Sequence, residues 1–255
     1  MKCIYLLIPS LAGTFIFFVI PFVRVIYYSF IDNQFRRNFV GLDNYVQTFQ
    51  NEFFQLALQN SLLLIVICIP VLILLAIIIS LVLSYGIKTL RKTRAAFILP
   101  MLIPTASVAE IWRLVFTGET VLPVYTLFIW KNIGICVILL TAALTAIEPE
   151  IFEAAKMDGA KGIKLHKRIS VPLILPTIIF TILLSIVNSF RVFKESYLFY
   201  GTNYPPSHSY TLQFYMNNNF LKLDYQALAT SSVYTMILVI ILVLVCFGLQ
   251  RRYSR

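Results

Sequence analysis

The residue types that usually carry enzyme chemistry are few and scattered in this chain of 255 residues. Its two histidines, His166 and His208, fall in separate loops, and neither an H-E-x-x-H nor a G-x-x-x-x-G-K-[ST] motif occurs. The sequence thus indicates no histidine metal site, no serine–histidine–aspartate triad and no P-loop. Four cysteines stand singly in apolar stretches: Cys3, Cys68, Cys136 and Cys246. Without C-x-x-C spacing they are interpreted as packing thiols, with no disulfide or metal role.

Polar side chains that suit a hydroxylated ligand lie inside an apolar stretch near 171–193. Ser185 and Ser189 are four residues apart and share one helix face, with Asn188 beside them. At 1.5 Å per residue they lie about 20–26 Å beyond Pro172, past the middle of a bilayer. Hydroxyl and amide groups can exchange hydrogen bonds with ligand hydroxyls. The alternative is that these groups only join one helix to another.

Two acidic residues also fall within apolar stretches, and each has a basic residue at helical spacing. Glu110 precedes Arg113 by three residues, and Arg191 precedes Glu195 by four. We therefore expect two local ion pairs near the outer membrane interface. The alternative, a proton relay through buried carboxylates, has little support.

The segment 148–162 predicts a short amphipathic helix. Pro149 suits a first helical turn, and Gly159 and Gly162 suit a helix end. Small or apolar side chains and one acid recur at three- and four-residue spacing: Ile151, Ala154, Ala155 and Asp158. About 10 residues cannot span a membrane. The helix therefore either lies flat on lipid or presents its small side chains to another protein.

The elements that would carry these residues are membrane helices. Hydrophobic residues make up 59% of the chain and charged residues 13%, with a mean hydropathy of +0.84. Soluble domains are about a quarter charged. Four runs contain no Asp, Glu, Lys or Arg, and each is long enough to cross a bilayer: 3–23, 53–87, 169–190 and 225–250. We predict one all-α, polytopic membrane domain over 1–255 with six transmembrane helices, near 3–28, 60–85, 95–117, 124–147, 171–193 and 226–249.

The net charge of +10 is a topology signal and no sign of nucleic-acid binding. Basic residues collect before the first span and after the second, fourth and sixth: Lys2; Lys88, Arg91, Lys92 and Arg94; Lys156, Lys161, Lys164, Lys167 and Arg168; and Arg251, Arg252 and Arg255. By the positive-inside rule this face is cytoplasmic, so both termini are expected on the cytoplasmic side of the cell membrane. The first apolar run is too long for a signal peptide, so we expect an uncleaved first helix.

Three loops are expected on the outer face, and the second of them, at 118–123, is very short. In the loop at 29–59, the stretch 45–49 is amphipathic enough for a short interfacial helix. In the loop at 197–222, Pro205 and Pro206 break any helix, and the run 217–219 of three asparagines favours irregular backbone.

A long, gapped pattern resembles the EAA loop of ATP-binding-cassette importer permeases. It reads Glu153-Ala154-Ala155, three residues, Gly159, nine residues, then Ile169-Ser170-Val171-Pro172, with Val171 where that motif usually has Leu. Three further phrases look like carbohydrate-type permeases: 39–45, Leu99-Pro100 with 111–113, and 189–193. The segment 116–130 looks shorter than in most relatives, and Tyr204-Pro205-Pro206 replaces a glycine-rich turn, which affects expected docking details on the outer side.

The resemblance implies a type I importer of the maltose or glycerol-phosphate kind, in which this chain is the first of two permeases. The partners implied are a second permease subunit, two cytosolic ATPase subunits, an extracytoplasmic solute-binding protein and the lipid bilayer. ATP and Mg²⁺ would bind the ATPase subunits, so this chain would be non-catalytic and hold no cofactor. The loop 148–172 would couple it to them through Glu153, Ala154, Ala155, Asp158 and Gly159.

The resemblance also implies a substrate pathway. Beside Trp130 lies a stretch that looks like the family's substrate segment, and alignment with the family points to the fifth span. The expected pathway residues are Lys131, Asn132, Ser185, Asn188, Ser189 and Arg191. The solute class implied is a sugar, an oligosaccharide or a glycerol phosphate. The alternatives are a permease of the same superfamily for amino acids or ions, and, with less support, a secondary transporter.

Overall fold

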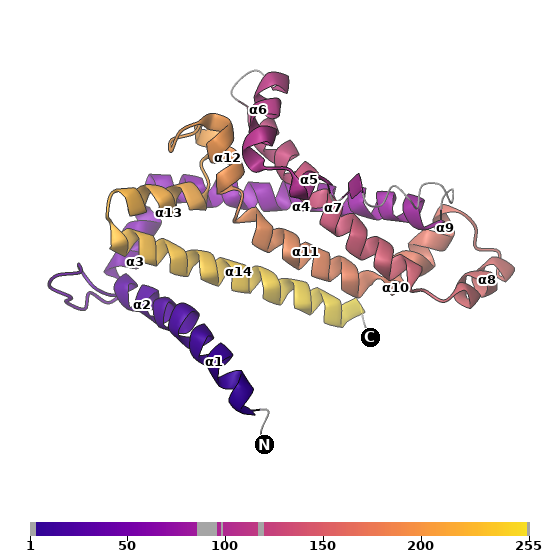
Figure 1. The fold of residues 1–255 in the computed structure, drawn as a ribbon, viewed down its shortest axis with the longest axis horizontal. Coiled ribbons are helices and arrows are strands. Elements are labelled where there is room, and N and C mark those ends of the chain that lie inside the picture. The colour runs from indigo at the N-terminus through magenta and orange to yellow at the C-terminus, as the bar shows by residue number, and fades with distance from the viewer. Residues whose placement is uncertain (1–3, 86–95, 98, 117–119, 254–255) are drawn as a thin grey trace. The chain divides into compact units, whose positions relative to one another are not determined.

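The computed structural model describes residues 4–85, 96–97, 99–116 and 120–253, and its regular elements there are helices apart from one isolated bridge between Ile31 and Phe39 (Figure 1). The chain divides into two compact units, Met1–Gln59 with Tyr210–Leu238 and Asn60–Ser209 with Val239–Arg255. Some residues named in the topology and cysteine predictions lie outside the described ranges: Lys2, Cys3, Lys88, Arg91, Lys92, Arg94 and Arg255.

In the first unit, a loop is anchored to the end of the first span. Helix α1 (Ile4–Thr14) continues through a π-turn (Phe15–Val19) into α2 (Ile20–Ser29), and α3 (Asp43–Gln50) follows the loop. The side-chain amide of Asn44 donates to the backbone oxygens of Ser29 at 3.0 Å and Ile31 at 2.9 Å. These bonds give the sequence phrase 39–45 a structural role, and α3 confirms a short helix over 45–49.

The first unit also contains α13 (Leu212–Leu221) and the start of α14 (Tyr225–Tyr253). The expectation of irregular backbone at the three asparagines is wrong, because all three lie within α13. Asn218 donates to the Tyr210 hydroxyl at 3.1 Å, and Asn219 donates to the Tyr215 backbone oxygen at 2.9 Å. Packing and these bonds outweigh the weak helix propensity of asparagine.

The core of the second unit is built from three long helices. They are α4 (Glu52–Tyr85), which begins in the first unit, α7 (Leu122–Thr145) and α11 (Leu175–Ser189). One buried cluster draws side chains from each of them, among them Leu72, Leu140 and Ile178. Since these helices carry few charges, they can pack apolar faces against one another and still present apolar faces to lipid.

The described residues contain four helices long and apolar enough to cross a membrane: Ile8–Ser29, Glu52–Ser84, Leu122–Thr145 and Tyr225–Arg251. A fifth possibility is the bent pair Ile163–Leu173 and Leu175–Ser189, whose axes differ by 70°. These helices match five of the six expected spans. The third expected span, 95–117, is interrupted, so helix length does not establish the count of six.

Prolines explain both irregular spans. In the third, α5 (Leu99–Leu102) and α6 (Thr105–Val115) are separated at Ile103 and Pro104, because proline pushes the preceding residue out of the helical region. In the fifth, α10 (Val171–Leu173) meets α11 at Ile174, close to Pro176. Pro176 lacks the N–H that would continue the helix, and the chain bends there.

Arg113 ties α6 to α12 (Phe193–Tyr200), which packs beside it (Figure 1). Its guanidinium donates to the backbone oxygens of Leu198 at 2.6 Å and Phe199 at 2.7 Å. It also pairs with Glu110 at 2.7 Å, which confirms that predicted ion pair. Helix α12 ends at Gly201, which has a φ of +68°. Arg113 therefore satisfies carbonyl groups that the end of α12 would otherwise leave without a partner.

We predict that Arg113→Met lowers the stability of the chain by about 1–2 kcal/mol, since it removes charge-assisted bonds to two carbonyls. Arg113→Lys should recover only part of this loss, because one ammonium cannot replace a guanidinium fork. Thermal unfolding of the purified transporter in nanodiscs measures the effect.

The matched control is Arg36→Met, since the Arg36 guanidinium has no partner within the described part of the chain. A midpoint for Arg113→Met equal to that of Arg36→Met would contradict the role given to Arg113.

Candidate functional site

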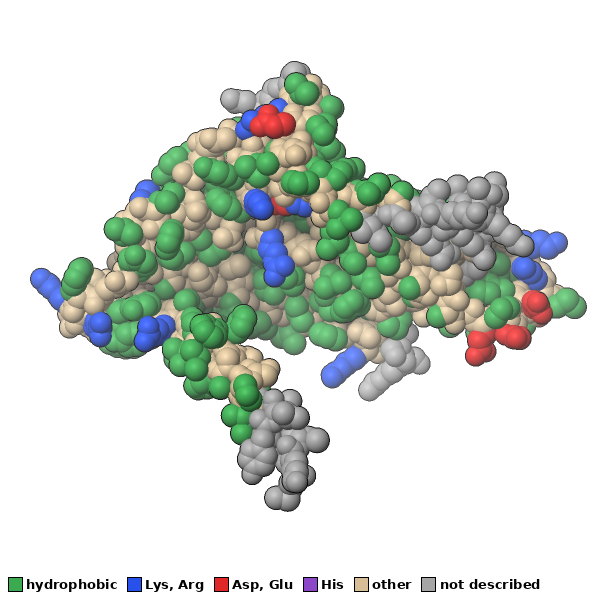
Figure 2. All heavy atoms as spheres, in the orientation of Figure 1, with side chains coloured by type: hydrophobic (Ala, Val, Ile, Leu, Met, Phe, Trp, Pro, Cys, Tyr) green, Lys and Arg blue, Asp and Glu red, His purple; other side chains and the backbone are tan. Residues whose placement is uncertain are grey.

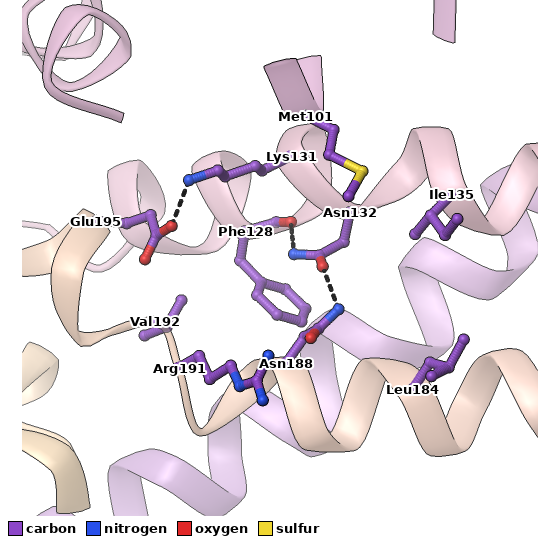
Figure 3. Close-up of a pocket in the computed structure, with 10 residues that line it drawn as sticks. All are labelled: Met101, Phe128, Lys131, Asn132, Ile135, Leu184, Asn188, Arg191, Val192 and Glu195. Atoms are coloured by element: carbon purple, nitrogen blue, oxygen red, sulfur yellow. Dashed lines mark hydrogen bonds and ion pairs between the residues drawn. The ribbon is translucent and has the colours of Figure 1, made fainter. Parts of the chain in front are cut away.

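A cavity of about 280 Å³ opens in the second unit between α7, α11, α5 and the first turn of α12 (Figure 3). Five of its ten lining residues are polar or charged, and the other five are apolar. The lining residues are Met101, Phe128, Lys131, Asn132, Ile135, Leu184, Asn188, Arg191, Val192 and Glu195. A mixed lining of this kind can bind a solute that has both hydroxyl groups and apolar ring faces.

An ion pair lies at one end of the cavity. The Lys131 ammonium contacts Glu195 Oε1 at 2.6 Å and donates to the Thr105 hydroxyl at 2.5 Å. Both charged side chains are largely buried, with 22% and 13% of their surface exposed. The other carboxylate oxygen of Glu195 is buried and has no hydrogen-bond partner in the described part of the chain. Glu195 therefore depends on Lys131 for charge compensation.

The predicted ion pair between Arg191 and Glu195 is wrong. Four-residue spacing brings two side chains together only on a continuous helix. Here α11 ends at Ser189 and α12 begins at Phe193, so Arg191 lies in the break between them. Helical spacing does not reveal the true partner of Glu195, Lys131, because it lies 64 residues away.

Two amide side chains line the middle of the cavity. Asn188 on α11 donates to the Asn132 side-chain oxygen at 2.9 Å, and Asn132 on α7 donates to the Phe128 backbone oxygen at 2.8 Å (Figure 3). These bonds fix the relative orientation of α7 and α11 at this level. They leave the Asn188 oxygen without a partner among the described residues, so it can accept a hydrogen bond from a ligand.

The structure brings together four of the six expected pathway residues: Lys131, Asn132, Asn188 and Arg191. Ser185 and Ser189 are buried and do not line the cavity. Their hydroxyls donate to the backbone oxygens of Thr181 at 2.8 Å and Ile186 at 2.7 Å, within their own helix. Of the three residues predicted on this helix, Asn188 is therefore the one that reaches the cavity.

The short helix expected after the fourth span is present as α8 (Pro149–Met157). Pro149 lies in its first turn, and Gly159 follows its end with a φ of +81°. In Figure 2, acidic and basic side chains gather where Figure 1 places this helix. The predicted start and end of the helix are thus confirmed.

The two alanines of the pattern lie on different sides of α8. Ala154 is exposed. Ile151, three residues before it, and Asp158, four residues after it, are exposed as well. Ala155 is 7% exposed and faces the rest of the chain. Ala155 is therefore a packing residue within this chain, whereas Ile151, Ala154 and Asp158 belong to the exposed surface of the helix and the turn that follows it.

A second cavity, of about 510 Å³, lies beside α8 and near the end of α7. Glu153 and Lys156 are among its polar lining residues. Two apolar side chains near it are strongly exposed, Met157 at 89% and Ile163 at 85%. Exposed apolar side chains in a loop rich in charge indicate a surface that another protein or lipid covers.

No group of three or more histidine, cysteine, aspartate or glutamate side chains in the described ranges could hold a metal ion. The cavity offers hydrogen-bonding amides and three charged groups, and α8 is a helix at the surface. These suit binding and movement of a solute.

Comparison with known proteins agrees with these features. The family model described as "Binding-protein-dependent transport system inner membrane component" matches residues 57–255. The arabinooligosaccharides transport system permease protein AraP of Bacillus subtilis is 29% identical over 240 residues, covering 82% of this chain and 75% of AraP. The sn-glycerol-3-phosphate transport system permease protein UgpA of Yersinia pestis is 26% identical over 280 residues, covering 98% of this chain and 94% of UgpA.

Among solved structures, a bacterial ABC transporter that imports the acidic polysaccharide alginate contains a similar chain. The TM-score is 0.78 at 23% sequence identity, and the match covers 100% of this chain and 96% of that one. This likeness shows the type I permease fold.

We predict that Glu195→Gln or Lys131→Met alone destabilises the chain by about 3–5 kcal/mol, because each leaves a buried charge without a partner. The double variant should lose much less than the sum of the two. Thermal unfolding of all three variants completes the double-mutant cycle.

Glu110→Gln is the matched control. It also removes a carboxylate charge, here from the ion pair with Arg113. The side chains of Arg113 and Glu110 are 38% and 67% exposed, so the loss of stability should stay below about 1 kcal/mol. Additive losses in the cycle would show that Lys131 and Glu195 do not compensate each other.

Proposed function

Because the chain belongs to the family of binding-protein-dependent transport system inner membrane components, we propose that it forms half of an ATP-driven import pathway for a carbohydrate or a glycerol phosphate. Supporting this solute class, relatives are named as permeases for arabinooligosaccharides and for sn-glycerol 3-phosphate. The observation that carries the proposal is the partly polar cavity within a chain that matches this family over residues 57–255.

The chain is a membrane component, and we propose that it crosses the membrane six times with both termini in the cytoplasm. Four single helices and the bent pair supply five crossings. The sixth would comprise α5 and α6 as one broken span. Broken helices at membrane depth are tolerated where they are covered by protein or line a cavity. Met101 on α5 lines the 280 Å³ cavity, as expected for a broken span.

The solute would pass along the cavity beside Asn188. Asn132 and Asn188 would exchange hydrogen bonds with solute hydroxyls, while Phe128 would pack against an apolar sugar face. Ser185 and Ser189, whose hydroxyls bond within α11, would hold the helix in shape. Because a single permease would line only one side of the route, a second permease subunit would complete it.

Helix α8 would dock on a cytosolic ATPase subunit. Ala154 has a small exposed side chain that permits close approach, and Glu153 beside it can accept a charge-assisted hydrogen bond. Asp158 would lie on the same docking face, and Ala155 would hold α8 against this chain from behind. Met157 and Ile163 would be covered on docking.

Two such ATPase subunits would bind ATP and Mg²⁺, so the chain itself would carry no cofactor and hydrolyse nothing. An extracytoplasmic binding protein would deliver the solute on the opposite face. ATP binding would close the ATPase subunits, move the two α8 helices, and expose the cavity to the other side of the membrane. Such alternating access requires a rigid connection between the docking site and the cavity. Helix α7 reaches from the cavity to the segment before α8 and would provide it.

We predict that Gly159→Val abolishes solute-stimulated ATP hydrolysis by the assembled transporter in proteoliposomes. No atom lies within 4 Å of an added Cβ at Gly159, so the defect would come from the φ of +81°, which a β-branched residue resists. Gly159→Asn should keep most of the stimulation, since asparagine tolerates this backbone region.

Gly248→Ala is the control for a glycine in an ordinary helical conformation and should behave as wild type. If α8 only lay flat on lipid, Gly159→Val would keep full stimulation, and that result would refute the coupling role.

A further inference from the structure

The cavity contains three formal charges that do not cancel. Lys131 and Arg191 are positive and Glu195 is negative, so the lining carries a net charge of +1. The Lys131 ammonium is engaged by Glu195 and Thr105. The Arg191 guanidinium has no hydrogen bond or ion pair with any residue that the structure describes, and Figure 3 marks none among the residues drawn. The excess charge is therefore located on Arg191.

Arg191 lines the cavity from a break between two helices. It lies in the break between α11 and α12, with an exposed side chain. The negative C-terminal end of α11 and the positive N-terminal end of α12 flank the break, and their partial charges largely offset each other. The helix ends consequently leave the guanidinium charge uncompensated.

The surroundings strengthen this charge. Five lining residues are apolar: Met101, Phe128, Ile135, Leu184 and Val192. The Arg191 side chain is exposed, but a solute bound against these apolar residues would exclude water from the guanidinium, and a charge acts more strongly where water is excluded. A guanidinium also presents paired N–H groups that match the two oxygens of a carboxylate or phosphate.

We propose that Arg191 determines the solute class, and that the cavity accepts a hydroxylated solute bearing a carboxylate or phosphate in preference to a neutral sugar. Arg191 binds the anionic group, while Asn188, one turn before it on α11, accepts a hydrogen bond from a solute hydroxyl. Lys131 takes no direct part because Glu195 holds it. This assignment rests on the proposed function, since it requires the cavity to lie on the transport route.

The volume sets the size of the unit recognised. About 280 Å³ is near the lower limit of roughly 300 Å³ for small-molecule sites. This chain therefore contacts one sugar ring or one short polyol phosphate at a time, and a longer anionic saccharide would be recognised one unit at a time.

The test is ATP-driven uptake by the complete transporter, with its binding protein, in proteoliposomes. Three labelled probes are compared: a galacturonate trimer, glycerol 3-phosphate, and a neutral galactose trimer with the same linkage as the galacturonate trimer. Wild type should import at least one anionic probe in preference to the neutral trimer. Arg191→Gln should raise the KM for that anionic probe about tenfold or more, the loss expected for one charge-assisted hydrogen bond.

Lys194→Gln is the matched control. It removes the same charge three residues further along, from an exposed side chain that does not line the cavity. It should leave uptake of all three probes unchanged, whereas Arg191→Lys should recover part of the anion uptake. Equal losses in Arg191→Gln and Lys194→Gln would indicate a general effect of charge and would overturn the proposal.

The outcomes separate this inference from the proposed function. Uptake of the neutral trimer alone, or an anion KM that does not change in Arg191→Gln, overturns the role of Arg191 while import itself stands. If none of the three probes is imported and ATP hydrolysis does not respond to them, both the inference and the proposed solute class fail.

Discussion

A charge inside an apolar helix must be compensated by an opposite charge, and in this chain that constraint joins Lys131 to Glu195. The pair connects α7 to α12, and the bond from Lys131 to Thr105 brings in α6. Arg113 fastens α6 to α12 again at the end of both helices. The break between α11 and α12 is thereby held in place, with Arg191 in the break and Asn188 just before it. The geometry of the cavity depends on these connections.

Long apolar stretches in the sequence predicted the long helices, because a span needs about 20 apolar residues. The short helix at 149–157 was also predictable, since Pro149 and Gly159 set its ends through local backbone chemistry. Local rules did not predict the broken third span or the 70° bend of the fifth. Prolines caused both irregularities, but a sequence does not tell whether a proline in a span bends, breaks or only kinks the helix.

Only part of the cavity lining could be predicted, again because a sequence does not show where a helix breaks. Helical spacing assigns neighbours correctly only where the helix is continuous. It succeeded for Glu110 and Arg113 within α6, and failed for Arg191 and Glu195 across a break. Resemblance to the permease family supplied Lys131 and Asn132, which no local pattern would have selected. Neither method distinguished Asn188, which lines the cavity, from Ser185 and Ser189, whose hydroxyls bond within the helix. Likewise, the burial of Ala155 depends on tertiary packing.

Alternating access requires the cavity beside Asn188 to open to opposite sides of the membrane as ATP binds. Thiol accessibility tests it directly: Asn188→Cys, in a variant without native cysteines, is exposed in proteoliposomes to a membrane-impermeant reagent, with and without ATP. Val187→Cys serves as the control, since Val187 is exposed on the same helix but does not line the cavity. ATP should change the labelling rate at position 188 several-fold and leave the rate at position 187 unchanged. Labelling at position 188 that is indifferent to ATP would contradict alternating access.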